Sequence, residues 1–358
     1  MIDRPRVLAG ATIALLAGAA LLTGCTKSED SASPSTSSSA GGQVVATNSP
    51  AGPGCTLQQY GAPPLDLKNA IVGFSQSEKE ANPFRIAETQ SIKDEAAKVG
   101  VKKLLTTNAQ SQLSKQISDI QDMLAQGAQF LIVAPLNSDG LEPALQAAAA
   151  KKVPVLTIDR KINSSACKDF LSFLGSNFVE QGKRAADAMI KATGGNAKVA
   201  ILLGSSGNNV TTDRTNGFVD QIKAQAPGIQ IVAQQTGEFA RDKGQAVMEQ
   251  LISSNPGINA VYAENDEMAL GAVTALKTAG KNPGKDVKIV SIDGTRNAVQ
   301  AIVDGTINAV IESNPRFGPL AFKTAQDFYS GTATQPGIII SDREYDTANA
   351  KDSLASAY

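Results

Sequence analysis

The 358-residue sequence predicts an α/β fold with two similar, Rossmann-like doubly wound lobes, each built on a parallel sheet. From Asn69 onward, short runs rich in β-branched residues alternate with longer amphipathic runs, the pattern of strands followed by helices. Most of the short runs are continuously apolar, which is typical of strands covered on both faces. A single sheet would need about eleven strands, so two sheets are favoured.

The expected strands are short apolar runs bounded by polar, Gly or Pro residues. In chain order they are 70–76, 103–107, 130–135, 153–159, 169–175, 198–204, 229–235, 260–264, 287–293, 309–312 and 338–341. Of the helices between them, the first has the clearest ends, because Asn82 and Pro83 suit its start and Gly100 suits its C-terminal cap. The other helices are expected near 112–126, 138–150, 178–193, 212–226, 241–253 and 266–279.

The two halves of the chain follow the same plan. Residues 71–76 form an expected strand, followed by a polar loop and a helix that opens near Pro83. Residues 199–204 form another, followed by the Ser, Gly and Asn loop 205–209 and a helix that opens near Thr212. The repeat lies in the pattern and not in the sequence, and it favours two similar lobes over one large domain.

The composition excludes several kinds of site. The chain has 33 Lys and Arg, 34 Asp and Glu, and no His. Ser-His-Asp and Cys-His catalysis and imidazole-based zinc sites are therefore excluded. A formal charge of −1 provides no basic field to attract nucleic acid. Enzymes that use Asp, Glu, Lys or a bound cofactor remain open, although the chain has neither a Walker A pattern nor a G-x-G-x-x-G spacing.

The N-terminus has the pattern of a targeting segment. Arg4 and Arg6 precede an apolar run, 7–22, that is too short for a permanent membrane span. The run ends in Leu22-Thr23-Gly24-Cys25, which resembles the lipobox of bacterial lipoprotein signal peptides. The resemblance implies that 1–24 is a signal peptide and that the exported chain is lipid-anchored at Cys25 on the extracytoplasmic face of the cell membrane. The alternative is an ordinary signal peptide with an incidental Cys.

The segment after Cys25, up to residue 56, is rich in Ser, Gly and Pro, which predicts a flexible tether. Outside the cytoplasm, Cys55 and Cys167 are free to oxidise. They form either a disulfide that clips the end of the tether to the folded body or two unpaired thiols, because spacing alone does not place their Cα atoms within reach.

Polar residues gather where the expected strands end. In open parallel sheets, ligands bind beyond the carboxyl ends of the strands, because loops and helix N-termini converge there. The residues at these ends, together with a pair at the start of the helix near 212, are Ser75, Gln76, Asp159, Arg160, Asn177, Asp213, Arg214, Asn265, Asp266, Asp293 and Asn314. Such a set suits a neutral polyhydroxylated ligand, because each hydroxyl both donates and accepts. Phe84 and Phe239 are placed to cover the C–H faces of a sugar ring.

Seven ordered motifs resemble those of type I periplasmic sugar-binding proteins, nearest the galactofuranose-binding branch. They are Val72-Gly73-Phe74-Ser75-Gln76, Asn82-Pro83-Phe84-Arg85, Thr157-Ile158-Asp159-Arg160, Asp213-Arg214, Gly237-Glu238-Phe239, Asn265-Asp266 and Ser291-Ile292-Asp293-Gly294. The resemblance runs in register from about 71 to 314. It implies an N-terminal lobe of 68–175 plus 314–335 and a C-terminal lobe of 176–313 plus 336–358, joined by hinge crossings.

The resemblance also implies roles for individual residues. Asp159 and Arg160 would hold sugar hydroxyls from the first lobe. From the second lobe, Arg214, Asn265 and Asp293 would do so, while Phe84 and Phe239 would sandwich the ring. Asn82 matches a polar contact of the ribose-binding branch, whereas Arg85 replaces a second aromatic of that branch and agrees with the galactofuranose branch. A furanose-type monosaccharide is therefore favoured over ribose.

The implied function is that of a substrate-binding lipoprotein of a carbohydrate ABC importer, a monomer that delivers its sugar to a permease driven by separate ATPase subunits. No cofactor, metal or nucleic acid is expected. The alternatives left open are a polyol-binding importer component, a sugar sensor that presents its ligand to a receptor, and a secreted sugar-modifying enzyme with Asp266 and Asp293 as a glycosidase pair.

Overall fold

The computed structural model describes residues 44–45 and 52–358 of the chain. The chain separates into two units, Met1–Ser39 and Ala40–Tyr358, and every described residue belongs to the second. The expected signal peptide, Cys25 and most of the expected tether lie outside the described residues. Within the described part, no helix is long and apolar enough to cross a membrane.

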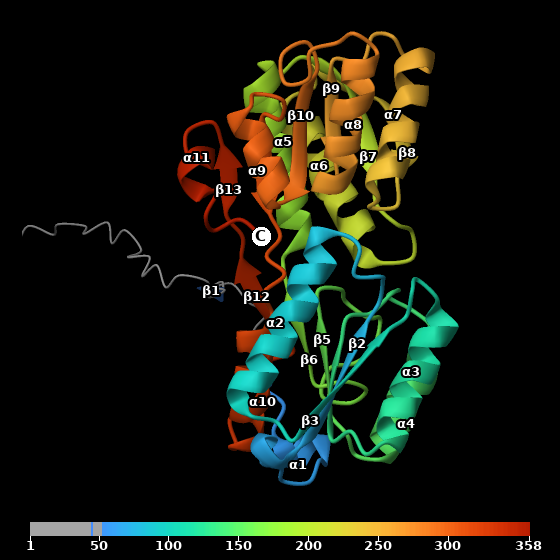
Figure 1. The fold of residues 1–358 in the computed structure, drawn as a ribbon, viewed down its shortest axis with the longest axis vertical. Helices are drawn as coiled ribbons and strands as arrows, with labels where there is room; N and C mark the ends of the chain where they lie inside the picture. Colours follow the sequence, from blue (N-terminus) through green and yellow to red (C-terminus); the bar gives the residue numbers. More distant parts are fainter. Residues whose placement is uncertain (1–43, 46–51) are drawn as a thin grey trace, which may run out of the picture. The chain divides into compact units, whose positions relative to one another are not determined.

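The first of two sheets has the strand order β1-β12-β6-β5-β4-β2-β3 (Figure 1). All neighbouring strands are parallel except β1, which pairs antiparallel with β12. Its strands are β1 (Val44–Val45), β2 (Ile71–Gln76), β3 (Lys103–Asn108), β4 (Phe130–Val133), β5 (Val155–Ile158), β6 (Ser172–Gly175) and β12 (Gly337–Ser341).

The second sheet has the order β13-β11-β10-β9-β7-β8. Only β13 runs antiparallel to its neighbour. The strands are β7 (Ala197–Leu203), β8 (Ile229–Thr236), β9 (Ala260–Ala263), β10 (Lys288–Asp293), β11 (Ala309–Glu312) and β13 (Glu344–Asp346). Two parallel sheets, each covered by helices, make this a two-lobed α/β protein, as the sequence predicted.

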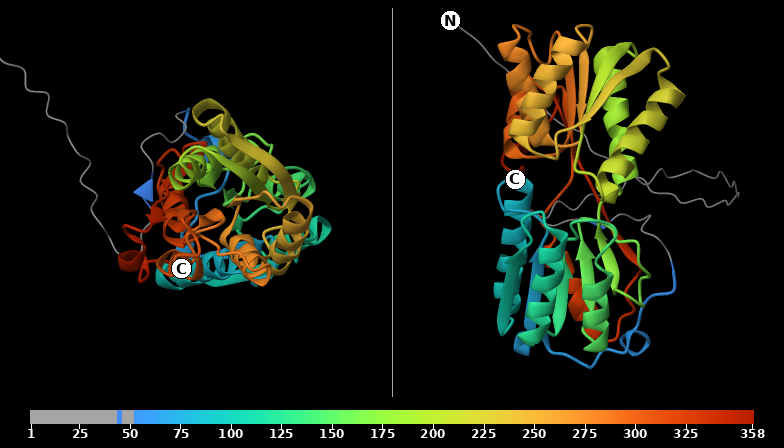
Figure 2. Two further views of the ribbon diagram at one scale, coloured as in Figure 1. Left: turned by 90° about the horizontal axis from the view of Figure 1, so that it is seen from above. Right: turned by 90° about the vertical axis from the view of Figure 1, so that its right-hand side faces the viewer.

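Helices cover both faces of each sheet (Figures 1 and 2). In the first lobe, α2 packs with α10 and α3 packs with α4; in the second, α5 packs with α6 and α7 packs with α8. The helical segments are α1 (Leu57–Tyr60), α2 (Pro83–Val99), α3 (Leu113–Ala125), α4 (Glu142–Ala150), α5 (Phe178–Thr193), α6 (Asn209–Gln225), α7 (Arg241–Ser254), α8 (Asp266–Thr278), α9 (Arg296–Val303), α10 (Gly318–Tyr329), α11 (Ala350–Ser353) and the 3₁₀ turn η1 (Leu67–Asn69).

Two helices begin at other positions than the sequence predicted. Helix α4 begins at Glu142 and not at residue 138, because Gly140 has a φ of 93° and Pro143 fits only the first turn. Helix α6 begins at Asn209, since the Asn208 side chain accepts from the backbone N–H groups of the next turn. Helices α1, α9, α10 and α11, the turn η1 and strands β1 and β13 were not predicted.

The chain crosses between the lobes after β6, after β11 and after β12. The sequence assigned 336–358 to the C-terminal lobe, and this is wrong for β12, which pairs in parallel with β6 of the first sheet. Ile339 and Ile340 belong to two different hydrophobic clusters, so β12 is buried on both faces and requires a place within the sheet. The last crossing therefore follows Ser341.

A disulfide joins Cys55 to Cys167, with their Cα atoms 5.3 Å apart. Cys55 is buried and exchanges two backbone hydrogen bonds with Thr334, of 2.7 and 2.9 Å. Thr56 caps α1. The predicted tether, which extended to residue 56, is therefore too long at its C-terminal end, because a bonded and buried Cys55 belongs to the folded lobe.

Candidate functional site

Residues from both lobes line a small slot at the carboxyl ends of the strands. Its volume is about 30 Å³. The lining residues are Glu78, Asn82, Phe84, Asp159, Arg160, Val210, Arg214, Phe239, Asn265 and Asp293. Eight of these ten were expected from the sequence; Glu78 and Val210 were not. The topology brings them together because parallel strands deliver their following loops to one edge of each sheet.

The first lobe contributes a buried network of charges. Arg85, at the start of α2, donates from Nη1 to Asp159 Oδ2 and to Glu88 Oε2, both at 2.7 Å, and from Nε to Glu78 Oε2 at 3.1 Å. Arg160 donates from Nη2 to Glu78 Oε1 at 2.6 Å. The carboxylate of Glu78 thus bridges two guanidinium groups. The Nε of Arg160 is buried without a hydrogen-bond acceptor in the described structure.

These contacts shift the protonation equilibria of the acids. Burial would raise the pKa of Glu78, but Arg160 and Arg85 together lower it to about 2. Burial raises the pKa of Glu88 despite its ion pair with Arg85. The first-lobe side of the slot therefore holds a Glu78 that is ionised at neutral pH between two cations.

The second lobe contributes Arg214 from α6. Its Nη1 donates to the carbonyl oxygen of Glu264 at 2.6 Å, its Nε donates to Gln181 Oε1 at 2.9 Å, and its Nη2 lies 3.7 Å from Asp293 Oδ1. Burial raises the pKa of Asp293 well above its usual range, while Arg214 opposes the shift. The two side chains present a donor and an acceptor to the slot.

Arg214 is held in place by close packing of α5 against α6. A Cβ on Gly182 would lie 2.3 Å from the carbonyl oxygen of Arg214, and one on Gly217 would lie 2.1 Å from that of Val179. Only glycine permits this approach of the two helix backbones. The approach brings Gln181 within hydrogen-bond distance of the Arg214 guanidinium.

Two phenyl rings line the slot. The Phe84 ring stacks under the Arg85 guanidinium, 5.0 Å from its carbon, and meets Tyr358 edge-on with centroids 6.2 Å apart. The Phe239 ring lies over Gly204, where a Cβ would be 1.9 Å from the ring. Asn265 donates to the carbonyl oxygen of Phe239 at 3.1 Å and so fixes the loop that carries it.

Strained backbone concentrates at this site. Among the described residues, six of the eight non-glycine residues with positive φ line the slot or the cleft outside it. They are Gln110, Ser111, Asp159, Glu238, Phe239 and Asp293. Such conformations cost energy and persist where the surrounding structure holds them, most often at binding sites.

Several residues expected at the site do not line the slot. Ser75 accepts from Gln116, and Gln76 donates to Glu88 and Thr89, so both serve the packing of the first lobe. Arg85 does not line the slot but contacts three residues that do, Asp159, Glu78 and Phe84. The remaining ones are Asn177, Asp213, Asp266 and Asn314.

These four residues have local roles. Asn177 is exposed and caps α5, while Asp213 accepts from Asn209. Asn314 accepts from the backbone N–H of Arg316 at 3.0 Å. Asp266 accepts four hydrogen bonds from Ser291, Gly294 and Thr295, and burial outweighs them to raise its pKa to about 6. These bonds tie α8 to the end of β10, and Asn265 is the N-cap of the helix.

Glu78 is the charged residue that the sequence analysis missed. It lies two residues beyond the end of β2, inside the loop, whereas the expectation considered residues directly at strand ends and helix starts. The sequence did offer one signal for Glu78: it is a charged residue between the end of a strand and the Asn82 N-cap. Val210 is apolar and offered none.

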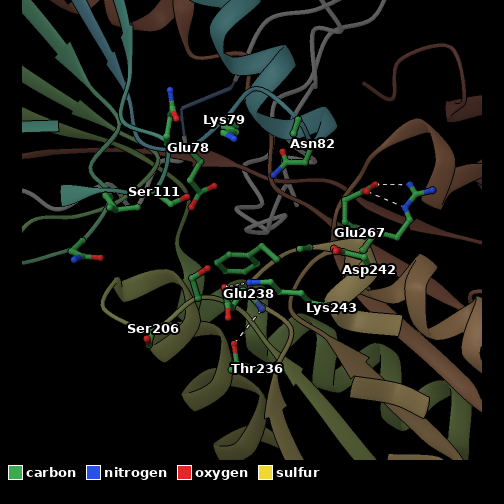
Figure 3. A pocket seen from close by; sticks show the side chains of 18 of the residues that line it. Glu78, Lys79, Asn82, Ser111, Ser206, Thr236, Glu238, Asp242, Lys243 and Glu267 are labelled. Carbon is green, nitrogen blue, oxygen red and sulfur yellow. Dashed lines mark hydrogen bonds and ion pairs between the residues drawn. The ribbon is translucent and has the colours of Figure 1, made fainter. Parts of the chain in front are cut away.

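The slot opens into a wider cleft of about 1110 Å³, which shares Glu78, Asn82 and Phe239 with it. In Figure 3, Glu78, Lys79, Asn82 and Ser111 lie on one side of this cleft, and Ser206, Glu238 and Lys243 lie on the other. Ion pairs join Arg241 to Glu267 and Lys243 to Glu238 along its second-lobe wall.

The slot itself is nearly closed. Its volume of about 30 Å³ holds roughly two water molecules, so a monosaccharide enters only when the lobes separate or the lining side chains move. Hydrogen bonds join the lobes directly: Ser138 N–H donates to the carbonyl oxygen of Gly207, and Lys161 N–H to Asn209 Oδ1, both at 2.9 Å.

The chemistry of the slot is that of binding through hydrogen bonds. Carboxylates, guanidinium groups and an amide surround it, with a phenyl ring from each lobe. Within the described residues, no group of three or more acidic or Cys side chains is placed to hold a metal ion. The arrangement can hold a small ligand that carries hydroxyls on its edge and C–H groups on its faces.

Comparisons with known proteins show the family of the chain. The model of the periplasmic binding protein domain matches residues 72–333. The galactofuranose-binding protein YtfQ of Escherichia coli (strain K12) is 37% identical over 269 residues, which are 74% of this chain and 83% of YtfQ. The ribose import binding protein RbsB of Bacillus subtilis (strain 168) is 36% identical over 272 residues, 76% of this chain and 85% of RbsB.

A solved structure with a bound furanose is also similar. It is the periplasmic binding protein component of the arabinose ABC transporter from Shewanella sp. ANA-3, bound to α- and β-L-arabinofuranose. The two chains superimpose with a TM-score of 0.76 and 36% sequence identity, over 80% of this chain and 94% of that one.

Proposed function

Because the chain belongs to the family of proteins with a periplasmic binding protein domain, we propose that it is the substrate-binding component of a carbohydrate ABC importer. The slot would take one monosaccharide. The observation that carries this proposal is the convergence of Asp159 and Arg160 from one lobe with Arg214 and Asp293 from the other, between two phenyl rings. Binding, and not turnover, is the activity, in agreement with relatives that are named as binding proteins.

Each sugar hydroxyl is both a donor and an acceptor, and the slot offers partners of both kinds. Asp159 and Asp293 supply acceptors. Arg160 and Arg214 supply donors, among them the Nε of Arg160, which is buried without an acceptor. The rings of Phe84 and Phe239 supply apolar faces for the C–H groups of the sugar.

A furanose is the favoured ligand. One relative is named for galactofuranose, and one similar solved structure has bound arabinofuranose. In this chain Arg85, and not a second aromatic ring, follows Phe84, and its guanidinium stacks on the Phe84 ring. The position after Phe84 therefore follows the galactofuranose branch and favours a furanose with an extra exocyclic hydroxyl over ribose.

Closure of the lobes would capture the sugar. Hydroxyls facing both lobes are satisfied only when the lobes meet, so the ligand stabilises the closed state. The direct contacts of Ser138 with Gly207 and of Lys161 with Asn209 would form on closure and break when the permease separates the lobes. The hinge is the set of three crossings after β6, β11 and β12.

The exported chain would be held on the extracytoplasmic face of the membrane by a lipid on Cys25, with the segment from Cys25 to Gly54 as tether. The Cys55–Cys167 disulfide would then mark where the tether meets the first lobe. Fractionation of cells that express the full chain or Cys25→Ser tests this. The parent chain should sediment with membranes and the variant should not; equal distribution would contradict the anchor.

A calorimetric screen of the purified chain against furanoses, pyranoses and polyols tests the main proposal. Asp159→Ala and Arg214→Ala should each weaken binding of the best sugar by about 2 to 4 kcal/mol, because a buried partner is left unsatisfied. Asp213→Ala, outside the slot, is the matched control and should retain affinity.

No binding by the parent chain, or equal losses in all three variants, would overturn the proposal. Tightest binding to an open-chain polyol would support the alternative ligand class, and turnover of the sugar would indicate an enzyme.

A further inference from the structure

We propose that Glu78 makes the slot selective for neutral sugars over anionic ones. The inference rests on the proposed function and adds a specificity determinant to it. Glu78 lies in the loop between β2 and α2 and lines both the inner slot and the outer cleft. It is thus the carboxylate that a sugar would meet as it passes from the cleft into the slot.

The geometry shows what Glu78 does to the two first-lobe cations. One carboxylate oxygen accepts from Arg160 Nη2 at 2.6 Å, and the other accepts from Arg85 Nε at 3.1 Å. Both guanidinium groups are buried, with side chains 4% and 2% exposed. Paired N–H groups of a buried guanidinium are the usual partners of a ligand carboxylate or phosphate. In this protein, Glu78 already occupies that position.

The charge balance of the slot points the same way. The first-lobe cluster contains two guanidinium groups and the carboxyl groups of Glu78, Glu88 and Asp159. The second lobe adds Arg214 with Asp293. A ligand carboxylate would lie close to the Glu78 carboxylate, which the two guanidinium groups keep ionised. Like charges brought together in such a site repel strongly, since solvent screens them poorly.

A neutral hydroxyl avoids this repulsion. It can accept from Arg160 Nε, which has no hydrogen-bond acceptor in the described structure, and donate to Asp159 or Asp293. Selectivity thus has two sources. The Glu78 carboxylate repels anionic ligands, and the hydrogen-bonding groups of the slot attract neutral sugars.

The chain supplies a matched control in the same loop. Glu80 lies two residues beyond Glu78, is exposed and does not line the slot. Glu80→Gln removes the same charge from the loop without changing the guanidinium pairs. A general effect of net charge would appear in both variants, whereas the proposed effect appears only when Glu78 is changed.

The experiment measures binding of D-galactose and D-galacturonate to the full chain by calorimetry. The two ligands differ only in a hydroxymethyl group and a carboxylate. We expect the parent chain and Glu80→Gln to prefer galactose by about 100-fold or more. In Glu78→Gln the ratio should fall by at least about tenfold, because an unpaired cation becomes available to the uronate. Glu78→Ala repeats the test should Glu78→Gln fail to fold, as judged by its thermal melt.

Three results would overturn the inference. The first is an unchanged ratio in a folded neutral variant at position 78, in a chain whose parent binds galactose. The second is a parent chain that binds galacturonate as well as galactose. The third is a parent chain that binds no neutral sugar at all. This result would overturn the proposed function together with the inference, and the measurement on the parent chain alone would reveal it.

Discussion

Gln181 Oε1 accepts a hydrogen bond of 2.9 Å from Arg214 Nε, and this bond connects the slot to the crossings between the lobes. The Gln181 amide nitrogen donates to Asp342 Oδ2 at 2.8 Å and to the carbonyl oxygen of Glu312 at 3.3 Å. Asp342 also accepts from the Ser176 hydroxyl at 3.1 Å. One buried amide therefore contacts residues from two of the crossings directly and the third through Asp342, and it orients a guanidinium that lines the slot.

Gln181→Met should weaken sugar binding by about tenfold although Gln181 does not line the slot. The change leaves Arg214 Nε without its acceptor and Asp342 Oδ2 without its donor, a loss of about 1 to 2 kcal/mol. Calorimetry with the best sugar of the screen measures the affinity. Gln221→Met, which removes an exposed hydrogen bond to Asp187, is the control. Equal affinities in the two variants would show that the bond does not orient Arg214 for binding.

Gly204→Ala should impair binding through Phe239. The new methyl would lie 1.9 Å from the ring, so the ring must leave its place over residue 204. We expect a loss of stability of about 1 to 3 kcal/mol from overpacking, together with weaker sugar binding. Gly257→Ala, whose methyl would contact only the Lys198 side chain at 3.4 Å, is the control. Parent-like affinity in Gly204→Ala would mean that Phe239 does not cover the ligand.

Removal of the disulfide should destabilise the first lobe. The Cys55–Cys167 bond closes a segment with a sequence separation of 112. Cys55→Ser combined with Cys167→Ser should cost about 2 to 5 kcal/mol, since the unfolded chain gains the freedom of that loop. Urea unfolding measures the loss, and a reductant added to the parent chain should reproduce it. An unchanged urea midpoint in the double variant would contradict the prediction.

The conformational stability of the chain should fall as pH rises from about 5 to about 8. Burial, the largest influence, raises the pKa of Asp342 from 3.8 to about 7 and that of Glu264 from 4.5 to about 7. In this window the native state binds more protons than the unfolded chain, so the free energy of unfolding decreases as pH rises. Glu78, with its pKa lowered to about 2, acts in the opposite sense only below about pH 4.5.

Asp342→Asn should reduce this pH dependence by a few kcal/mol, because an amide keeps an acceptor for Gln181 and does not titrate. Glu312 raises and Arg184 lowers the pKa of Asp342, and both remain in the variant. Urea midpoints at pH 5 and pH 8 measure the effect, with the exposed Asp220→Asn as control. Identical pH dependence in parent and Asp342→Asn would contradict the shift.

Most of the architecture could be predicted from local patterns. The continuous apolar runs became buried parallel strands, and α2 begins and ends at the residues that suit its caps, Asn82 and Gly100. Strand β12 shows the limit of this reasoning. Its apolar run predicts a buried strand equally well in either sheet, and only its pairing with β6 decides which sheet it joins.

The candidate site likewise divides into residues that the sequence could identify and residues that it could not. Asp159 and Asp293 could be found because strand ends are legible in a sequence, whereas Arg214 was chosen near a helix start that the structure places at Asn209. The same reasoning chose Asp266, which does not line the slot, and missed Glu78, which does. Both are acidic residues near a strand end, yet Asp266 accepts four hydrogen bonds within its own lobe, whereas Glu78 bridges two guanidinium groups at the slot.

The sequence by itself determined the order of strands and helices, the edge of each sheet where polar groups gather, and the absence of imidazole chemistry, because these depend on residue type and short-range spacing. The tertiary structure alone decided which acids pair with which cations, how α5 and α6 place Gln181 against Arg214, and how nearly closed the slot is. Those properties depend on distances between segments far apart in the chain, which packing and burial set and which spacing along the chain does not encode.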